Sequence, residues 1–220
     1  MSQQSTPLLD IYETLLDHFG PQHWWPGDSP LEIMIGAILT QNTNWANVEK
    51  AMDNIKAAQV LQTDRLYQMD RESLSELIRP AGYYRLKAER LKHYLTWFVD
   101  QYQGNLAQLS QVSTRDLRDE LLAIKGIGPE TADSILLYAL NRPIFVVDTY
   151  TARMAVRHRL IDGPFDYHQL QEIFMDALPM DVTLYNEFHA LLVALGKHFC
   201  RPKARCSECP LEHIPHEFVP

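Results

Sequence analysis

Apolar residues recur every three to four positions along most of this chain, which is the spacing of one face of an α-helix. Near the N-terminus this spacing predicts a helix over residues 8–19. Gly20 can end that helix, because glycine tolerates the backbone conformation that closes many helices. The apolar stripe consists of Leu8, Leu9, Tyr12, Leu15, Leu16 and Phe19.

The helical spacing continues through the rest of the chain. Residues 144–147, Ile-Phe-Val-Val, form a short extended run that is too isolated to found a sheet. The pattern therefore predicts an all-α protein of about ten helices. Beyond the first, helices are expected near residues 31–39, 43–57, 73–78, 86–102, 113–122, 129–140, 149–160, 167–178 and 183–199.

A glycine-rich turn interrupts the helical pattern at residues 124–132, Ile-Lys-Gly-Ile-Gly-Pro-Glu-Thr-Ala. Gly126 and Gly128 allow a tight hairpin with positive φ angles, and Pro129 stands where a helix would begin. The flanking helices and this turn predict a helix–hairpin–helix unit. N–H groups at the start of its second helix would bind a phosphate without a side chain. Asp148 beyond it suggests chemistry beside a held nucleic-acid backbone.

The composition is that of an ordinary globular protein, with 46% hydrophobic and 22% charged residues in a chain of 220. We find no apolar run of membrane-spanning length and no leader like a signal peptide, which predicts a cytoplasmic, nucleoid-associated protein. The net charge of −8 argues against nonspecific coating of nucleic acid but leaves room for local basic patches. Three groups of cations are candidates, with a solvated surface as the alternative for each: residues 85–92, 153–159 and 197–205.

The hairpin and Asp148 together resemble the motif of the helix–hairpin–helix, Gly/Pro, Asp (HhH-GPD) superfamily of DNA glycosylases. In length, the chain is most similar to the endonuclease III branch of that superfamily. Residues 40–43, Thr-Gln-Asn-Thr, stand where that branch has an alanine-glutamine motif. Residues 82–88, Gly-Tyr-Tyr-Arg-Leu-Lys-Ala, match its glycine-x-tyrosine-x-x-lysine-alanine loop. A cysteine cluster lies near the C-terminus, as in that branch. The resemblance covers nearly the whole chain.

This resemblance implies two helical lobes with damaged double-stranded DNA bound across the cleft between them. A six-helix lobe of residues 21–145 would carry the hairpin. Residues 1–20 would join residues 146–220 in a second lobe with the cysteine loop. Nothing in the sequence suggests more than a monomer.

Asp148 is the catalytic residue that the resemblance implies. Breaking the bond between a base and its sugar builds positive charge on the sugar, which a fixed carboxylate stabilises. The same group can orient or deprotonate the attacking water. The local alternative is an N-cap for the helix that begins near Thr149, and the two roles are compatible.

The residue at the lyase position is not lysine. In bifunctional members of the superfamily, a lysine two residues past the second hairpin glycine attacks the sugar and forms a Schiff base. Glu130 occupies that position here, and Lys125 precedes the first glycine. The resemblance therefore implies a monofunctional glycosylase that uses water. The alternative interpretation of Glu130 is an acid that suits the N-terminal end of a helix.

Three tryptophans narrow the expected substrate. Trp24 and Trp25 precede Pro26, and Trp45 follows the glutamine loop. A flipped base needs flat partners, and tryptophan faces attract a positively charged alkylated purine such as 3-methyladenine. The arrangement resembles the 3-methyladenine glycosylase subgroup. Core packing is the alternative, although two successive tryptophans cannot both point into one core.

Two loops and the hairpin are expected to contact DNA. By resemblance, Gln41 fills the gap left by the flipped nucleotide, and Tyr83 wedges into the opposite strand. The alternatives are a polar loop residue and a packed loop aromatic. The expected DNA-binding residues are Gln41, Tyr83, Lys125, Gly126, Ile127, Gly128 and Thr131.

The cysteine cluster departs from the family pattern. The family's iron–sulfur loop has four cysteines separated by six, two and five residues. This chain has Cys200, Cys206 and Cys209, separated by five and two, and Pro215 stands at the fourth place. His213 or His216 could supply a fourth ligand. A [4Fe–4S] cluster, a structural zinc ion and no metal are the three alternatives.

Two other functions stay open. One is an endonuclease III-like glycosylase for oxidised pyrimidines, against which Glu130 and the Trp-Trp-Pro element count. The other is a noncatalytic DNA-structure-binding protein that uses the same hairpin.

Overall fold

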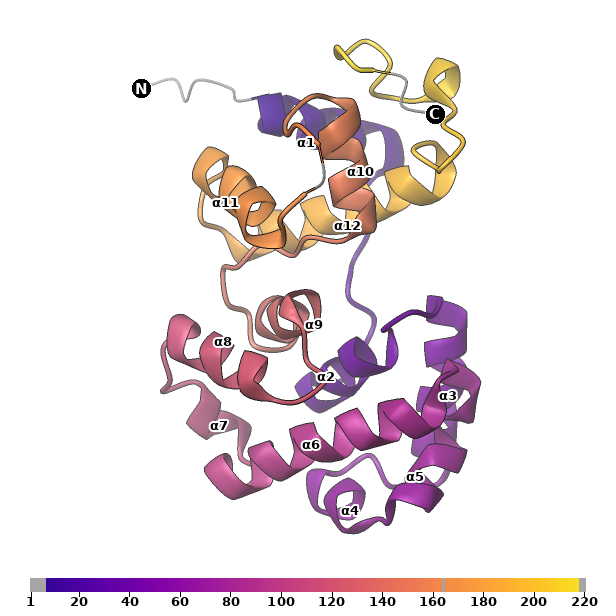
Figure 1. Cartoon of the computed structure of the whole chain (residues 1–220), viewed down its shortest axis with the longest axis vertical. Helices are drawn as coiled ribbons and strands as arrows, with labels where there is room; N and C mark the ends of the chain where they lie inside the picture. Colours follow the sequence, from indigo (N-terminus) through magenta and orange to yellow (C-terminus); the bar gives the residue numbers. More distant parts are fainter. Residues whose placement is uncertain (1–6, 164, 218–220) are drawn as a thin grey trace. The chain divides into compact units, whose positions relative to one another are not determined.

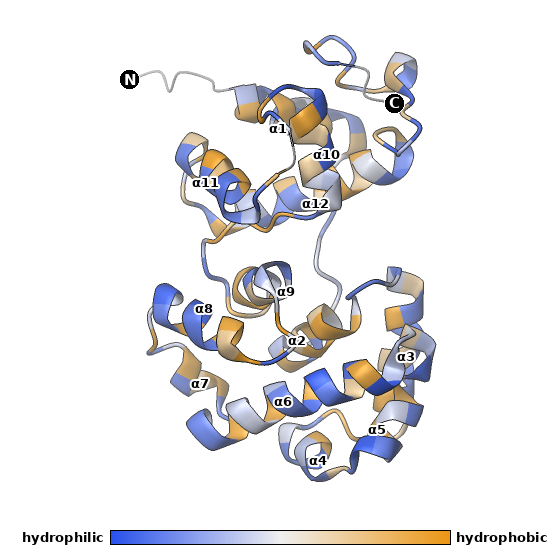
Figure 2. Ribbon diagram, viewed as in Figure 1, coloured by the Kyte–Doolittle hydropathy of each residue, from blue (hydrophilic) through white to orange (hydrophobic). Residues whose placement is uncertain are grey.

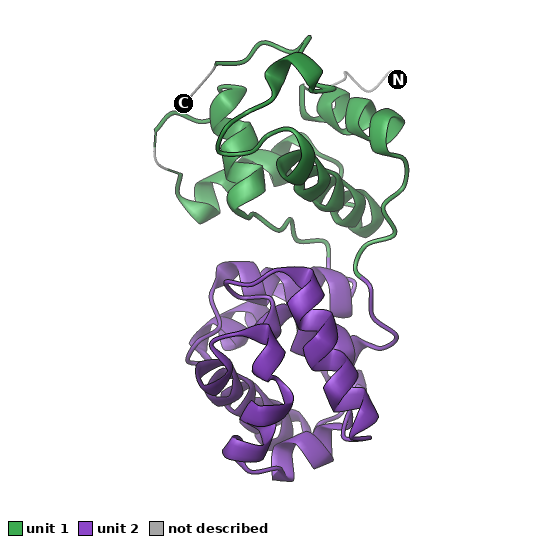
Figure 3. Ribbon diagram, turned by 90° about the vertical axis from the view of Figure 1, so that its right-hand side faces the viewer, with its two compact units in different colours: residues 1–25, 143–220 green, residues 26–142 purple. Residues whose placement is uncertain are grey.

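The computed structural model describes residues 7–163 and 165–217, and every regular element in these ranges is helical (Figure 1). This confirms the all-α prediction. The chain divides into two compact units, one of residues 1–25 and 143–220 and the other of residues 26–142 (Figure 3). The division falls at 25/26 and 142/143, where the sequence suggested 20/21 and 145/146. Within the described ranges, no helix is both long and apolar enough to span a bilayer.

The continuous unit is built around α2 (Pro30–Leu39), whose residues are mostly buried and which packs against α6, α9 and η2. Figure 2 shows this helix as predominantly hydrophobic. Because apolar residues occur all round it, α2 can be covered on several sides. The other elements are α3 (Trp45–Ala57), α4 (Thr63–Gln68), α5 (Arg71–Leu77), η1 (Arg79–Ala81), α6 (Tyr84–Tyr102), α7 (Leu106–Leu109), α8 (Thr114–Ala123), α9 (Pro129–Ser134) and the π-helical η2 (Ile135–Ala139).

Two short helices of this unit were not predicted. Each of α4 and α7 buries a single leucine, Leu66 and Leu109. One buried residue cannot establish a repeat, so the hydrophobic pattern contains no helical period at either place. Helices α2 and α8 each begin within one residue of the expected position, and a side chain caps each of them, Ser29 for α2 and Ser113 for α8.

The discontinuous unit is centred on α12 (Val182–His198), which packs against α1 (Pro7–Phe19) and α10 (Thr149–Arg157). It also contains α11 (Tyr167–Ala177) and the short η3 (Cys206–Glu208). Helices α10 and α12 approach closely at Gly196, where an added Cβ would lie 2.1 Å from the ring of Tyr150. A larger residue than glycine would therefore separate the two helices.

The extended run at residues 144–147 is buried, and its main role is to deliver Asp148 to the start of α10. Phe145 stacks on Phe174 with ring centroids 4.4 Å apart, and its carbonyl oxygen accepts a hydrogen bond from Gln171. Core packing thus holds the chain immediately before Asp148 in one place.

Candidate functional site

Asp148 is the N-cap of α10, and its two carboxylate oxygens have different surroundings. Oδ1 accepts hydrogen bonds from the backbone N–H of Tyr150 at 2.9 Å and of Thr151 at 2.8 Å, and from the Thr151 hydroxyl at 3.0 Å. Oδ2 lies 3.5 Å from Nε2 of His189, a buried residue on α12. The cap therefore uses one oxygen and leaves the other directed at the histidine.

Asp148 stays ionised although its side chain is only 11% exposed. Burial raises the pKa of a carboxyl, but the electrostatic interaction with His189 and the hydrogen bonds from Thr151 outweigh it and hold the pKa of Asp148 below its ordinary 3.8. A fixed negative charge is the form that stabilises a cationic sugar. His189 was not found from the sequence, where its one signal is a histidine within the apolar run of α12.

The hairpin between α8 and α9 has one left-handed residue, not two. Gly126 has φ of +96°, whereas Gly128 has φ of −99° and acts as the N-cap of α9. The expectation of positive φ at both glycines is thus wrong for Gly128, whose extended backbone suits the residue before Pro129. The N–H of Ile127 donates to the carbonyl of Ile124 at 3.0 Å and closes the turn. That amide is therefore engaged within the hairpin.

Gln41 is hydrogen bonded to the hairpin. Its Nε2 donates to the carbonyl of Gly126 and to the hydroxyl of Thr131, both at 3.0 Å, while its Oε1 accepts from Arg90. The Arg90 side chain also packs against Gly126, where an added Cβ would lie 2.4 Å from Cγ. The structure thus brings three predicted DNA-binding residues together and adds Arg90, which the sequence indicated only as a member of the basic group at residues 85–92.

Tyr83 projects into solvent beside a buried lysine. The Tyr83 side chain is 69% exposed and stands at the start of α6. Lys87, four residues later, is 1% exposed, and its Nζ donates to the carbonyls of Leu39 at 2.8 Å and Ala81 at 2.7 Å. Burial, with a smaller effect of Arg90, lowers the pKa of Lys87 to about 8. Lys87 is therefore a structural link and not part of a basic surface patch.

Lys125 and Glu130, on either side of the hairpin, are both exposed. Nζ of Lys125 lies 3.5 Å from a carboxylate oxygen of Glu89, and its carbonyl oxygen lies 3.0 Å from Nδ1 of His93. Glu130 stands in the first turn of α9, where a negative charge suits the helix dipole.

Trp24, Trp25 and Trp45 are all half-buried and lie outside the fully buried core. Trp24 and Trp25 belong to the discontinuous unit and meet edge to face, with ring centroids 5.5 Å apart. Nζ of Lys197 lies 5.7 Å from the centroid of Trp24, so that ring already attracts a cation. All three rings are therefore partly exposed.

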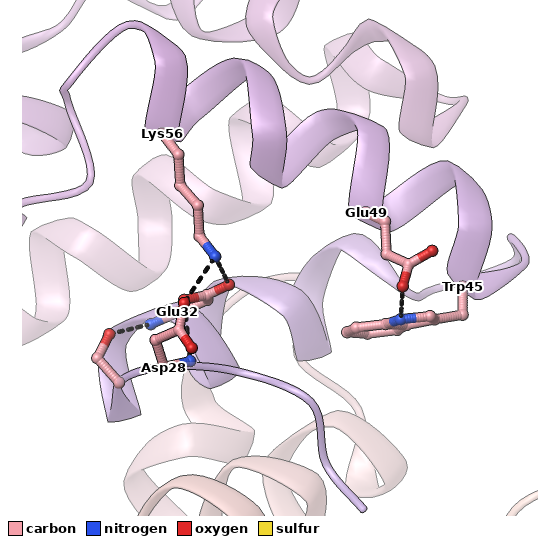
Figure 4. Close-up of polar contacts among 6 residues, drawn as sticks. Asp28, Glu32, Trp45, Glu49 and Lys56 are labelled. Carbon is pink, nitrogen blue, oxygen red and sulfur yellow. Dashed lines mark hydrogen bonds and ion pairs between the residues drawn. The ribbon is translucent and has the colours of Figure 1, made fainter.

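Trp45 begins α3 in the continuous unit, and its Nε1 donates to Glu49 one turn later at 2.9 Å (Figure 4). This bond anchors the edge of the ring. Further along α3, Lys56 forms ion pairs with Asp28 at 3.1 Å and Glu32 at 2.5 Å (Figure 4). These pairs tie α3 to the start of α2 and so hold the helix that carries Trp45.

The three cysteine thiols line one cavity at the end of α12, and none forms a disulfide. Cys200 is buried, and its sulfur accepts a hydrogen bond from Arg157 at 3.1 Å. His216 also lines the cavity, whereas His213 is exposed and lies outside the set of lining residues. Within the described ranges, no three His, Cys, Asp or Glu side chains are arranged to hold a single metal ion. Thiolates and imidazole are nonetheless the donors that iron–sulfur clusters and zinc use.

Comparison with known sequences identifies the family of this chain. Residues 35–180 match the HhH-GPD superfamily of base excision DNA repair proteins. A Methanocaldococcus jannaschii protein, named provisionally as a DNA repair glycosylase, is 49% identical over 209 residues, or 94% of each chain. Endonuclease III of Thermotoga maritima is 30% identical over 186 residues, which cover 84% of this chain and 81% of its own.

Solved structures share the fold. The 3-methyladenine DNA glycosylase of H. pylori, bound to 1,N6-ethenoadenine, superposes with a TM-score of 0.76 and 29% identity over 87% of this chain and 98% of its own. A non-covalent complex of endonuclease III with DNA gives a TM-score of 0.79 at 22% identity over 93% of this chain and 92% of its own.

Proposed function

This chain belongs to the HhH-GPD superfamily of base excision DNA repair proteins and is a DNA glycosylase, and we propose that it is monofunctional and releases alkylated purines such as 3-methyladenine. The observation that carries the proposal is the ionised Asp148, with one oxygen held by the helix cap and the other facing His189. The three tryptophans and Glu130 at the lyase position supply the finer assignment.

The tryptophans support an alkylated purine as the substrate. Trp24, Trp25 and Trp45 are half-buried aromatics whose faces suit a flat, positively charged base. The H. pylori relative, which was solved with a modified adenine, is a 3-methyladenine glycosylase by name. The discriminating experiment is mass spectrometry of the bases freed from alkylated DNA, with DNA containing oxidised pyrimidines assayed in parallel.

Substitution of the tryptophans tests their proposed stacking on the base. Trp25→Ala and Trp45→Ala are expected to lose 3-methyladenine release while DNA binding is retained. Trp97→Phe is the matched control, because Trp97 packs among aromatic residues of α6. Full activity of both variants would overturn the stacking proposal.

Glu130 supports a reaction with water in place of a Schiff base. A carboxylate cannot form an imine with the sugar, so Asp148 would orient water and stabilise the sugar cation. Borohydride is expected to trap no covalent adduct with damaged DNA, whereas an endonuclease III trapped in the same assay is the positive control. A strong adduct that disappears in Lys125→Ala would contradict the proposal and identify the nucleophile.

Gln41, Tyr83 and the hairpin support binding to double-stranded DNA with a flipped nucleotide. Tyr83 is exposed enough to wedge between bases, and Gln41 would exchange its hairpin bonds for contacts within the duplex. Tyr83→Ala is expected to reduce the fluorescence change of a base analogue placed at the lesion. An unchanged signal would exclude the wedge.

The cysteine loop is proposed to bind a metal centre as a structural staple. Arg201, Lys203 and Arg205 in this loop are exposed and available for DNA phosphates. Iron and zinc analysis of protein purified without oxygen, together with its visible absorbance, tests this assignment. Protein that lacks both metals would overturn it.

A further inference from the structure

Arg90 is a half-buried cation of α6 whose charge is not paired with a carboxylate. Among the described residues, its guanidinium has one hydrogen-bond acceptor, the neutral amide oxygen of Gln41, and takes part in no ion pair. Arg118 of the same unit is, by contrast, neutralised by Asp133, to which it donates at 2.7 and 3.0 Å. A guanidinium has five N–H donors, so Arg90 keeps donors for a further acceptor. A partly buried positive charge without a counter-charge favours the binding of an anion.

The neighbours of Arg90 on α6 do not compensate its charge. Lys87, three residues earlier on the same face of the helix, is a second cation, and its Nζ is held by carbonyl groups. The charge of Arg90 contributes to the lowered pKa of Lys87, so the two cations interact. Glu89 is the adjacent acid, but its carboxylate lies 3.5 Å from Nζ of Lys125. The part of α6 that contacts the hairpin is therefore positive.

The one acceptor of Arg90 is a side chain that has to move if it enters DNA. Oε1 of Gln41 accepts from Arg90. Nε2 of Gln41 donates to the carbonyl of Gly126 and to the hydroxyl of Thr131, both at 3.0 Å. A glutamine in the gap of a duplex cannot keep these bonds, because its amide then lies between the bases. Its departure leaves the guanidinium of Arg90 beside the hairpin without an acceptor.

We propose that Arg90 is a latch that couples DNA binding to the release of Gln41. In the free protein, its guanidinium holds Gln41 against the hairpin. On the duplex, the guanidinium exchanges the amide oxygen for a phosphate oxygen of the DNA backbone, and Gln41 is freed to enter the gap. A hydrogen bond between two charged groups is stronger than one to a neutral amide, and the arginine fork matches a phosphate. The latch rests on the gap-filling role of Gln41 proposed above and adds the means of its release.

The competing interpretation is that Arg90 is only a structural link, because its aliphatic stem packs against Gly126. The salt dependence of DNA binding separates the two. A residue that contacts a phosphate contributes to the release of counterions, so removing its charge makes the slope of log K against log salt less steep. A residue that only supports the fold leaves this slope unchanged.

The first measurement is titration of the full chain against labelled undamaged duplex at several salt concentrations. Arg90→Gln is expected to reduce the slope by about one, and Arg90→Lys, which keeps the charge, should restore it. Arg65→Gln is the matched control with the same change of charge. Arg65 is an exposed residue of α4 that donates to the carbonyl of Gln59 at 2.7 Å, so its substitution should keep the wild-type slope. A wild-type slope in Arg90→Gln would overturn the phosphate contact.

The second measurement tests the coupling with Gln41→Ala, which leaves Arg90 in place. Without the amide, Arg90 reaches a phosphate and breaks no hydrogen bond, so binding to undamaged duplex should tighten about 2- to 10-fold. The gain should vanish in the double variant with Arg90→Gln. No gain in Gln41→Ala, or the same gain in the double variant, would overturn the latch. Thermal melts of each variant show whether a loss of affinity reflects unfolding.

A duplex with an abasic-site analogue separates the latch from the role on which it rests. If Gln41 fills the gap, Gln41→Ala should lose the preference of wild type for this duplex over the undamaged one. An unchanged preference would overturn the gap-filling role, and with it the release, whereas the salt slope of Arg90→Gln still decides the phosphate contact. Base release from alkylated DNA by wild type, measured in parallel, decides the proposed glycosylase substrate independently of both.

Discussion

Nε2 of His189 on α12 lies 3.5 Å from Oδ2 of Asp148, the carboxylate oxygen that the α10 cap does not use. The two residues come from different helices of the same unit, and both are nearly buried. His189 offsets the effect of burial, which by itself raises the pKa of Asp148. His189 is therefore a positioning residue that keeps the carboxylate charged.

The first prediction is that His189→Leu shifts the acid limb of the pH profile to higher pH. Without the histidine, burial dominates, so the pKa of Asp148 rises and the active anion is lost at a higher pH. The midpoint of the acid limb of kcat/KM should move to higher pH. His189→Gln, which keeps a hydrogen-bond donor, should show a smaller shift. A uniform loss of activity at every pH in His189→Leu would indicate a purely structural role.

The second prediction separates the cap role of Asp148 from its catalytic role. Asparagine is also a good N-cap, so the free energy of unfolding of Asp148→Asn should lie within about 0.5 kcal/mol of the wild-type value. It removes the charge, so base release should fall about 10²- to 10⁴-fold. Asp148→Ala should lose the activity and also about 0.5–2 kcal/mol of stability. Thermal melts and single-turnover base release measure the two effects.

Asp148→Asn also tests the noncatalytic alternative. A DNA-structure-binding protein would show no base release in wild type or in the variant, with binding unchanged in both. Base release by wild type that Asp148→Asn retains in full would show that the carboxylate only caps α10.

The long helices and the position of Asp148 could be predicted from the sequence. Helix α12 repeats its apolar pattern over several turns, and Asp148 follows a buried run at the start of α10. Both features are local, so the order of residues contains them. Asp148 as a cap was one of the alternatives that the sequence left open, and the structure confirms the cap.

The contacts between distant segments could not be predicted. His189 and Asp148 are 41 residues apart in the chain, and Gln41 meets the hairpin 85 residues later. No periodicity links such positions, because helix packing alone brings them together. The basic group at residues 85–92 shows the same limit, since Lys87 reads as a surface charge in the sequence and is buried in the fold.

The third prediction concerns the two hairpin glycines, which the free protein constrains differently. Gly126 has a positive φ and Arg90 lies against it, so Gly126→Ala should lose about 1–3 kcal/mol of stability. At Gly128, an added Cβ meets nothing within 4 Å, and φ is negative. Gly128→Ala should therefore fold normally.

A loss of DNA affinity in Gly128→Ala would then reflect a lost contact with DNA and not a change in folding. If the backbone binds a phosphate here, the added methyl group stands in its way, and affinity should fall with no change in melting temperature. Titration of labelled duplex at two salt concentrations measures this. Wild-type affinity in Gly128→Ala would show that phosphate does not approach this glycine.

The fourth prediction concerns Lys87, which joins the end of α2 to the end of η1 through two carbonyl groups. These ends precede the glutamine loop and the tyrosine loop. Lys87→Met removes both bonds, so amide hydrogen exchange at residues 40–44 and 82–83 should become faster and DNA affinity should fall. Lys92→Met is the control. Nζ of Lys92 donates to carbonyl groups of α4 and of Met69 just after it, and the substitution should leave both loops unchanged.

The lowered pKa of Lys87 gives this variant a second readout. The pKa is about 8 in the fold against 10.5 for an ordinary lysine, so between these values the unfolded chain binds the proton more readily. The free energy of unfolding of wild type should therefore rise with pH from about 8 toward 10, relative to Lys87→Met, by up to about 1.4 kcal/mol per pH unit. The difference between the two free energies of unfolding removes the contributions of the tyrosines and other lysines that titrate in this range, because both proteins contain them. A constant difference would mean that Lys87 keeps an ordinary pKa, and that the carbonyl bonds compensate fully for its burial.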